Sequence, residues 1–168
     1  LHDTVSTICA MGVDCIVVRH RSSGAPARIA DWVDPLGISV VNAGDGWHQH
    51  PTQALLDCYT LRSKLGSLEG RRIGIIGDVK HSRVARSQVD AYRLLGAEVV
   101  LVAPPTLLPP AVETWGVELA DSLDDVLGEL DVVGLLRMQN ERMDDALVPS
   151  IADYTATEGD KRSLTIRL

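Results

Sequence analysis

The residues with the clearest chemical potential lie in the stretch 42–53, NAGDGWHQHPTQ. It follows an apolar run, 38–41, that is typical of a buried strand, and it precedes residues with helical spacing. Pro51 suits a first helical position, because its missing N–H needs no partner there. His50 and Gln53 would then share one face of a helix N-terminus, where amide N–H groups and the helix dipole attract anions. An imidazole and a carboxamide can also polarise a carbonyl, so this stretch predicts a site for a small anion that carries one.

A simpler interpretation of the same stretch is structural. A Gly-rich connection from strand to helix with Pro in the first turn is common in α/β proteins, and a His-x-x-Gln pair at such a position is usually only a cap. On local chemistry alone, both interpretations stay open.

Three arginines follow predicted strands. Arg19 comes just after the strand 13–18, Arg83 starts a helix after a strand, and Arg137 ends another strand. Ligands of open parallel sheets bind outside the carboxyl ends of the strands, and arginine holds phosphate or carboxylate with two parallel hydrogen bonds. One such arginine is more often a surface residue, but three at equivalent ends indicate a ligand with several negative groups.

Strands and helices alternate along the chain with short connections. This order predicts an α/β fold with parallel sheets, and the polar connector 67–70 predicts a division into residues 1–66 and 67–168. The predicted strands are 13–18, 38–41, 72–76, 98–102, 117–119 and 131–136; the predicted helices are 4–11, 25–33, 51–65, 82–95, 110–115 and 123–130.

Composition limits the functional classes. The 168 residues are 45% hydrophobic and 23% charged, as in globular proteins, and the net charge of -7 argues against a general nucleic-acid surface. No apolar run has the length of a membrane span, and residues 1–11 lack the basic start of a signal peptide, so we expect a cytoplasmic protein. The three cysteines have no metal spacing and predict reduced, buried thiols. No Gly-x-Gly-x-x-Gly or Walker motif indicates a nucleotide.

Four ordered motifs resemble those of aspartate carbamoyltransferase, the catalytic chain of pyrimidine biosynthesis. The resemblance runs from Leu1 to about Tyr154. It is carried by Arg-His-x-x-x-Gly-Ala at 19–25, Asn-Ala-Gly-Asp-Gly and His-Pro-Thr-Gln within 42–53, the segment GDVKHSRVARS at 77–87, and Arg-x-Gln-x-Glu-Arg at 137–142.

The resemblance implies a fold of two parallel-sheet α/β domains joined by the long helix 51–65, with the active site in the cleft between them. Residues 1–66 would be the C-terminal part of the carbamoyl-phosphate-binding domain, and residues 67–168 an incomplete aspartate-binding domain. The family also implies a homotrimer with shared active sites, and regulatory or pyrimidine-pathway subunits as further partners.

The resemblance also assigns roles to individual residues. Arg19, His50 and Gln53 would bind carbamoyl phosphate, and the two carboxylates of L-aspartate would be held by Arg83, Arg137 and Gln139. The amino group of aspartate would attack the carbamoyl carbon while Arg19 and His50, the catalytic pair, stabilise the oxyanion. No metal and no organic cofactor are implied.

The match fails at both ends of the chain. The family's Ser-Thr-Arg-Thr-Arg phosphate loop, and the Ser and Lys that a neighbouring subunit donates, would precede Leu1, and its His-Pro-x-Pro loop is missing. From Thr155 onward the sequence no longer follows the family pattern. The chain therefore resembles a fragment, and we expect it to be weakly active or inactive by itself.

Two alternatives remain. Ornithine carbamoyltransferase shares the first substrate, but it would need an acidic residue and a Trp-x-Ser-Met-Gly-like loop where this chain has Arg137-Met138-Gln139. The second alternative is a catalytically incomplete homologue with only a binding or assembly role. The retained Arg19, His50 and Gln53 argue against it, and the missing loops argue for it.

Overall fold

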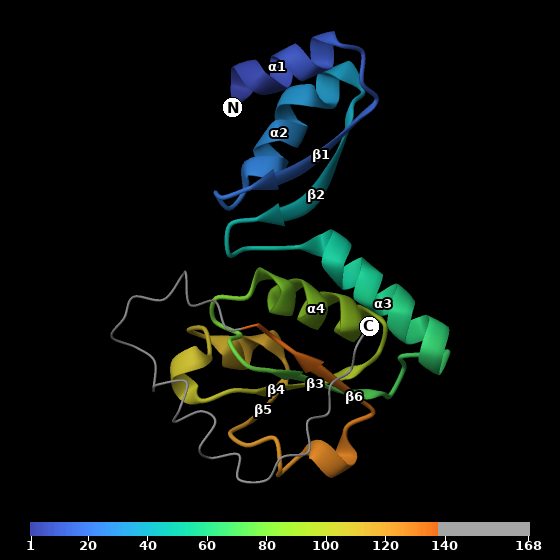
Figure 1. The fold of residues 1–168 in the computed structure, drawn as a ribbon, viewed down its shortest axis with the longest axis vertical. Helices are drawn as coiled ribbons and strands as arrows, with labels where there is room; N and C mark the ends of the chain where they lie inside the picture. The colour runs from blue at the N-terminus through green and yellow to red at the C-terminus, as the bar shows by residue number, and fades with distance from the viewer. Residues whose placement is uncertain (138–168) are drawn as a thin grey trace. The chain divides into compact units, whose positions relative to one another are not determined.

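The computed structural model describes residues 1–137, in which two separate parallel sheets are formed (Figure 1). The first sheet pairs β1 (Cys15–His20) with β2 (Ser39–Asp45), and α2 (Ala25–Val33) connects them. Val5 of α1 (His2–Ala10) packs with Val18, Ile29 and Val33 into a small apolar core. These elements carry the first two sequence motifs, at 19–25 and 42–46.

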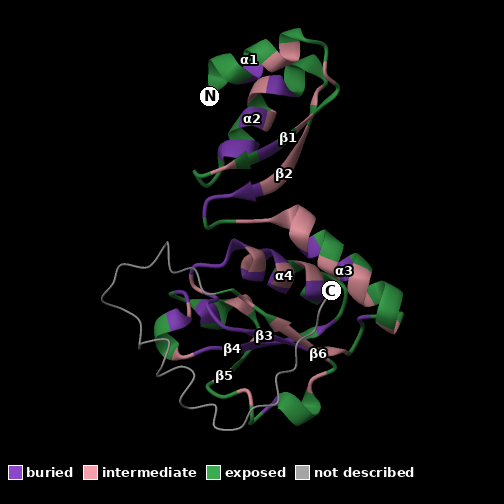
Figure 2. Cartoon of the chain, viewed as in Figure 1, coloured by how far each residue is buried: buried purple, intermediate pink, exposed green. Residues whose placement is uncertain are grey.

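The second sheet has the strand order β5-β4-β3-β6, with every pair parallel. Its strands are β3 (Arg72–Ile76), β4 (Glu98–Val102), β5 (Glu118–Ala120) and β6 (Val132–Leu135). The central strands β3 and β4 are almost wholly buried (Figure 2), as expected for parallel strands that are covered on both faces.

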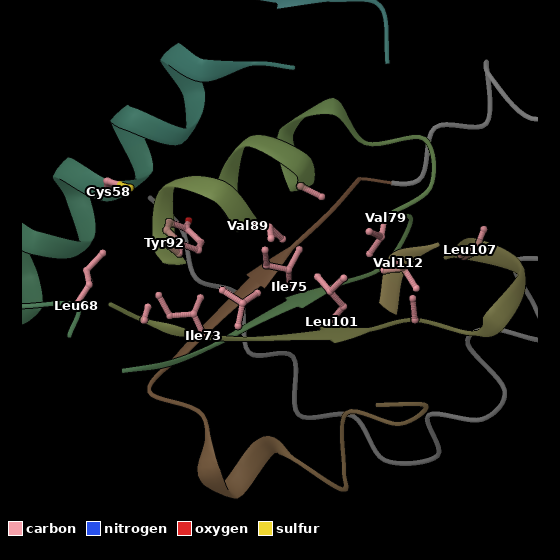
Figure 3. Close-up of a cluster of buried hydrophobic side chains, with 14 residues drawn as sticks. Cys58, Leu68, Ile73, Ile75, Val79, Val89, Tyr92, Leu101, Leu107 and Val112 are labelled. Carbon is pink, nitrogen blue, oxygen red and sulfur yellow. The ribbon is translucent and has the colours of Figure 1, made fainter. Parts of the chain in front are cut away.

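One face of the second sheet is covered by α3 (Pro51–Leu65) and α4 (Arg83–Leu94). Cys58 of α3, and Val89 and Tyr92 of α4, lie over Ile73 and Leu101 of the sheet (Figure 3). On the other face, Val126 packs with Ile76, Val100 and Val102. Both faces of the sheet are therefore packed, and the loops that follow its strands lie at its carboxyl edge.

Most predicted elements are confirmed, because their patterns were strong. The bounds of α3, β3 and β4 coincide with the predicted ones, and Ser82 caps α4 by accepting the N–H of Ala85 at 3.1 Å. The predicted role of α3 as the bridge between two domains, and the boundary at 66/67, stay predictions.

Three predicted elements differ from the structure. The strand expected to end at Val41 runs to Asp45, because the backbone of Asn42 continues the pairing with β1 although its side chain is polar. The helix expected at 123–130 is only a 3-10 turn, Leu127–Glu129. Gly128 lies at its centre, where glycine disfavours a helix, and Leu130 instead packs beside Gly74. The short helix predicted at 110–115 is likewise a 3-10 segment, Val112–Trp115.

Candidate active site

His50 is the N-cap of α3, with Pro51 in the first turn. The imidazole Nδ1 accepts the backbone N–H of Gln53 at 3.3 Å and lies 3.2 Å from the hydroxyl of Thr52. Because Nδ1 acts as an acceptor, the proton of the neutral ring is on Nε2. The structural and the functional interpretations are therefore compatible: one ring nitrogen caps the helix and the other remains a donor.

The charges around His50 favour an anion. Burial lowers the pKa of His50 below its ordinary value of 6.5, and the positive charges of Arg83 and Arg19 lower it further. Both arginines thus act electrostatically on the imidazole, together with the dipole of α3. The result is a neutral hydrogen-bond donor in a positive field, which suits an oxygen that develops negative charge.

This geometry predicts that the imidazole of His50 is the Nε2–H tautomer at pH 7 and titrates below pH 6.5. Nitrogen-15 correlation spectra of the histidine rings over a pH series would test it. A proton on Nδ1, or a midpoint at or above 6.5, would contradict the cap. Since the folded pKa is depressed, the contribution of this group to stability is complete above pH 6.5 and lost as the pH falls through the folded value.

Gln53 lies in the first turn of α3, and its amide is held by Asp57. Gln53 Nε2 donates to Asp57 Oδ1 at 3.0 Å, and the other oxygen, Oδ2, accepts Gln88 Nε2 of α4 at 2.7 Å. A carboxylate only accepts hydrogen bonds, so the NH₂ end of the Gln53 amide faces Asp57. Its carbonyl oxygen is the end that Asp57 does not engage.

Arg83 is buried at the first position of α4, close to the strand-to-loop stretch after β2. Its guanidinium donates to the carbonyl of Gly46 at 3.3 Å. A Cβ atom at Gly44 would lie only 2.9 Å from Arg83 Cζ, and Gly44 has a φ of +118°. Only glycine therefore lets the backbone approach this side chain so closely.

Two further contacts fix the start of α4. The hydroxyl of Ser87 accepts the backbone N–H of His50 at 2.9 Å, which ties the cap of α3 to α4. In the preceding loop, the buried Asp78 accepts the N–H of His81 at 3.2 Å and lies 2.9 Å from its Nδ1. The position of Arg83 thus follows from hydrogen bonds on both sides of it.

The remaining predicted residues are placed differently. Arg19 is exposed and lies inside β1, not after it, where the pairing with β2 shifts between Val18 and His20; such a bulge redirects a side chain. Arg137 follows β6 at the carboxyl edge of the second sheet, next to the loop that leads to Arg83. Gln139 lies outside the described residues.

Asp45 is a structural residue of the site that the sequence reasoning quoted but gave no role. It is 1% exposed and accepts N–H groups from Gly24 at 2.7 Å, Gln49 at 3.1 Å and the Asn42 side chain at 3.1 Å, and it lies 3.1 Å from the His48 ring. Burial alone would raise its pKa, but these hydrogen bonds outweigh burial and lower it. The sequence signal that could have indicated this role is an Asp shortly after the predicted strand 38–41 and directly before a Gly.

Replacing Asp45 with Ala is expected to destabilise the chain by about 3 kcal/mol, because three N–H donors lose one shared charged acceptor, which is itself buried. Urea unfolding would measure the loss. His48→Ala is the control: its ring is half-exposed, so we expect less than about 1 kcal/mol. The contribution of Asp45 is complete above its ordinary pKa of 3.8 and lost as the pH falls through the folded value. An unchanged midpoint in Asp45→Ala would refute this role.

Among the described residues, no group of three or more His, Cys, Asp or Glu side chains is placed to hold a metal ion. Cys9, Cys15 and Cys58 are free thiols, as predicted, but the expectation that they are buried holds only for Cys58, since Cys15 is exposed and Cys9 is half-buried. Within residues 1–137, no helix has both the length and the apolarity to cross a membrane.

In open parallel-sheet α/β proteins, ligands bind outside the carboxyl ends of the strands, and this chain has a capping histidine and arginines near such ends. Residues 1–63 match the family described as aspartate/ornithine carbamoyltransferase, carbamoyl-P binding domain. The chain is 55% identical over 168 residues to the aspartate carbamoyltransferase catalytic subunit of Saccharopolyspora erythraea, covering 100% of this chain and 54% of that subunit. That alignment includes the segment from Thr155 onward.

Solved structures agree. Aspartate transcarbamoylase from Trypanosoma cruzi in complex with phosphate superposes with a TM-score of 0.76 at 32% identity, over 94% of this chain and 52% of that one. The complex of the same enzyme with carbamoyl phosphate and aspartate superposes with a TM-score of 0.69 at 33% sequence identity. That match covers 84% of this chain and 47% of the other. The chain belongs to the aspartate/ornithine carbamoyltransferase family, and it spans about half the length of the relatives it matches.

Proposed function

We propose that this chain supplies active-site residues for transfer of the carbamoyl group from carbamoyl phosphate to the amino group of L-aspartate, giving N-carbamoyl-L-aspartate and phosphate. The observation that carries the proposal is the neutral His50, whose Nε2–H lies at the start of α3 in the positive field of Arg83 and Arg19. The Trypanosoma cruzi enzyme in complex with carbamoyl phosphate and aspartate supports it.

In this mechanism the aspartate amine attacks the carbamoyl carbon, and the carbonyl oxygen becomes negative. His50 Nε2–H and Arg19 stabilise that oxygen, which is the kind of preorganised donation that contributes about 2.7–4 kcal/mol in other enzymes. Arg83, Arg137 and Gln139 bind the carboxylates of aspartate, so that the amine is held near the carbon. The C–O bond to phosphate then breaks, and the departing phosphate takes the electron pair of that bond and the proton that the amine loses. No metal or cofactor takes part.

The family resemblance also supports a wider proposal. The enzyme would act in the cytoplasm in de novo pyrimidine biosynthesis, as a homotrimer with shared active sites and with regulatory or pathway subunits as partners. The arginines at the second site favour a dicarboxylate over ornithine, whose side-chain amine is cationic.

The test supplies labelled carbamoyl phosphate with aspartate and ornithine in one tube and identifies the product. It is run on the 168-residue chain and on a chimera in which this chain replaces the aligned 168 residues of the Saccharopolyspora erythraea subunit. Carbamoyl-aspartate from the chimera supports the proposal, and product from the chain alone would overturn the expectation of weak activity. Citrulline would favour the ornithine enzyme, and no product from either protein would reject catalysis.

A further inference from the structure

Asp57 lies outside every motif that carries the family resemblance, yet it contacts the proposed site. It is four residues after Gln53 on α3, and one of its oxygens accepts the Gln53 amide while the other accepts Gln88 of α4. All three side chains are half-buried. Each oxygen therefore has its own donor, and the two glutamines are joined through one carboxylate.

This arrangement fixes the direction of the Gln53 amide. A carboxylate is planar, so the 2.7 Å bond from Gln88 to Oδ2 sets the position of Oδ1, which then holds the NH₂ end of Gln53 at 3.0 Å. Hydrogen bonds to a charged acceptor are about twice as strong as neutral ones. Without Asp57, the amide could present either its NH₂ group or its oxygen to a ligand.

We propose that Asp57, locked by Gln88, is a positioning residue that keeps the Gln53 oxygen turned to the ligand and so selects a carbamoyl group over an acetyl group. This inference rests on the proposed function. A carbamoyl group carries an NH₂ donor where an acetyl group of nearly equal size carries a methyl group. An acceptor held at that point favours the first and leaves the second without a partner.

The test is made in the same chimera, with carbamoyl phosphate as substrate and acetyl phosphate as competitive inhibitor. Asp57→Leu keeps nearly the same size but carries no polar atom, so it accepts from neither glutamine and leaves the Gln53 amide free to turn. We expect KM for carbamoyl phosphate to rise about tenfold while Ki for acetyl phosphate stays within about twofold. The ratio Ki/KM thus falls about tenfold.

A second variant restores the hydrogen-bond pattern with reversed polarity. In Asp57→Asn/Gln88→Glu, the new NH₂ group donates to Glu and the remaining oxygen is free to accept Gln53. We expect the ratio to return to within about threefold of the parent value. A structural role alone would change the melting temperature of the variants without moving this ratio. Ser63→Ala is the matched control. It removes a hydroxyl that donates a hydrogen bond to the backbone carbonyl of Tyr59 farther along α3, and it is expected to leave the ratio unchanged.

The outcomes separate this inference from the proposed function. If the unmodified chimera forms no carbamoyl-aspartate, both fail. If it forms product but Asp57→Leu keeps the parent ratio, or the double variant shows no recovery, only the role of Asp57 is overturned.

Discussion

Replacing His50 with Asn is expected to lower kcat of the chimera by about 10²–10³-fold while leaving its stability nearly unchanged. Asn is among the best N-cap residues, so it can accept the Gln53 N–H in place of Nδ1. It does not reproduce the Nε2–H donor, whose loss removes stabilisation that forms mainly in the transition state. Initial rates over a matrix of both substrate concentrations would give kcat and the two KM values.

His50→Ala is the companion variant, because it removes the donor and the cap together. The fall in kcat should match that of His50→Asn, while the free energy of unfolding should drop by about 1 kcal/mol. A normal kcat in His50→Asn would show that the imidazole takes no part in the chemistry and that His50 serves only as the helix cap.

Gly44→Ala is expected to lower kcat/KM for aspartate by about 10²-fold, although Gly44 is assigned no direct contact with substrate. The added Cβ would lie 2.9 Å from Arg83 Cζ and 3.1 Å from Nε, so the guanidinium must shift. A displacement of about 1 Å in a positioning group can cost that much. Steady-state kinetics with aspartate as the varied substrate would measure it.

Gly37→Ala separates this displacement from backbone strain. Gly37 also has a positive φ, +68°, but a Cβ there would meet nothing within 4 Å. It should lose stability, by about 1 kcal/mol, without a change in kcat/KM. Equal losses of kcat/KM in the two variants would show that strain, and not the position of Arg83, causes the effect.

The sequence allowed the second sheet and α3 to be predicted closely, since β3 and β4 are short apolar runs and Pro51 and Gly66 delimit the helix. It also indicated that His50 and Gln53 share the start of α3. The extension of β2 to Asp45 was not predictable from side chains, because parallel pairing depends on backbone groups that every residue type carries.

The long-range contacts of the site were equally hidden. Two sets of hydrogen bonds join α3 to α4. One runs from the N–H of His50 to Ser87, and the other from Gln53 through Asp57 to Gln88. Spacing within one helix can suggest the Gln53–Asp57 pair, but no local pattern identifies the partner on α4. The assignment of roles to individual residues therefore rested on the resemblance, and it remains a set of predictions for the variants above.

The strand order of the second sheet has a consequence for the order of folding. Ile73 of β3 pairs with Val99 of β4 and also with Val132 of β6, which is much farther along the chain. Closing the longer loop costs more entropy, and contacts of high sequence separation slow folding. We expect β3, α4 and β4 to assemble first and β6 to dock late. Arg83 would then be in place before Arg137 reaches the carboxyl edge, so the two arginines that we propose to bind aspartate come together only in the last step of folding.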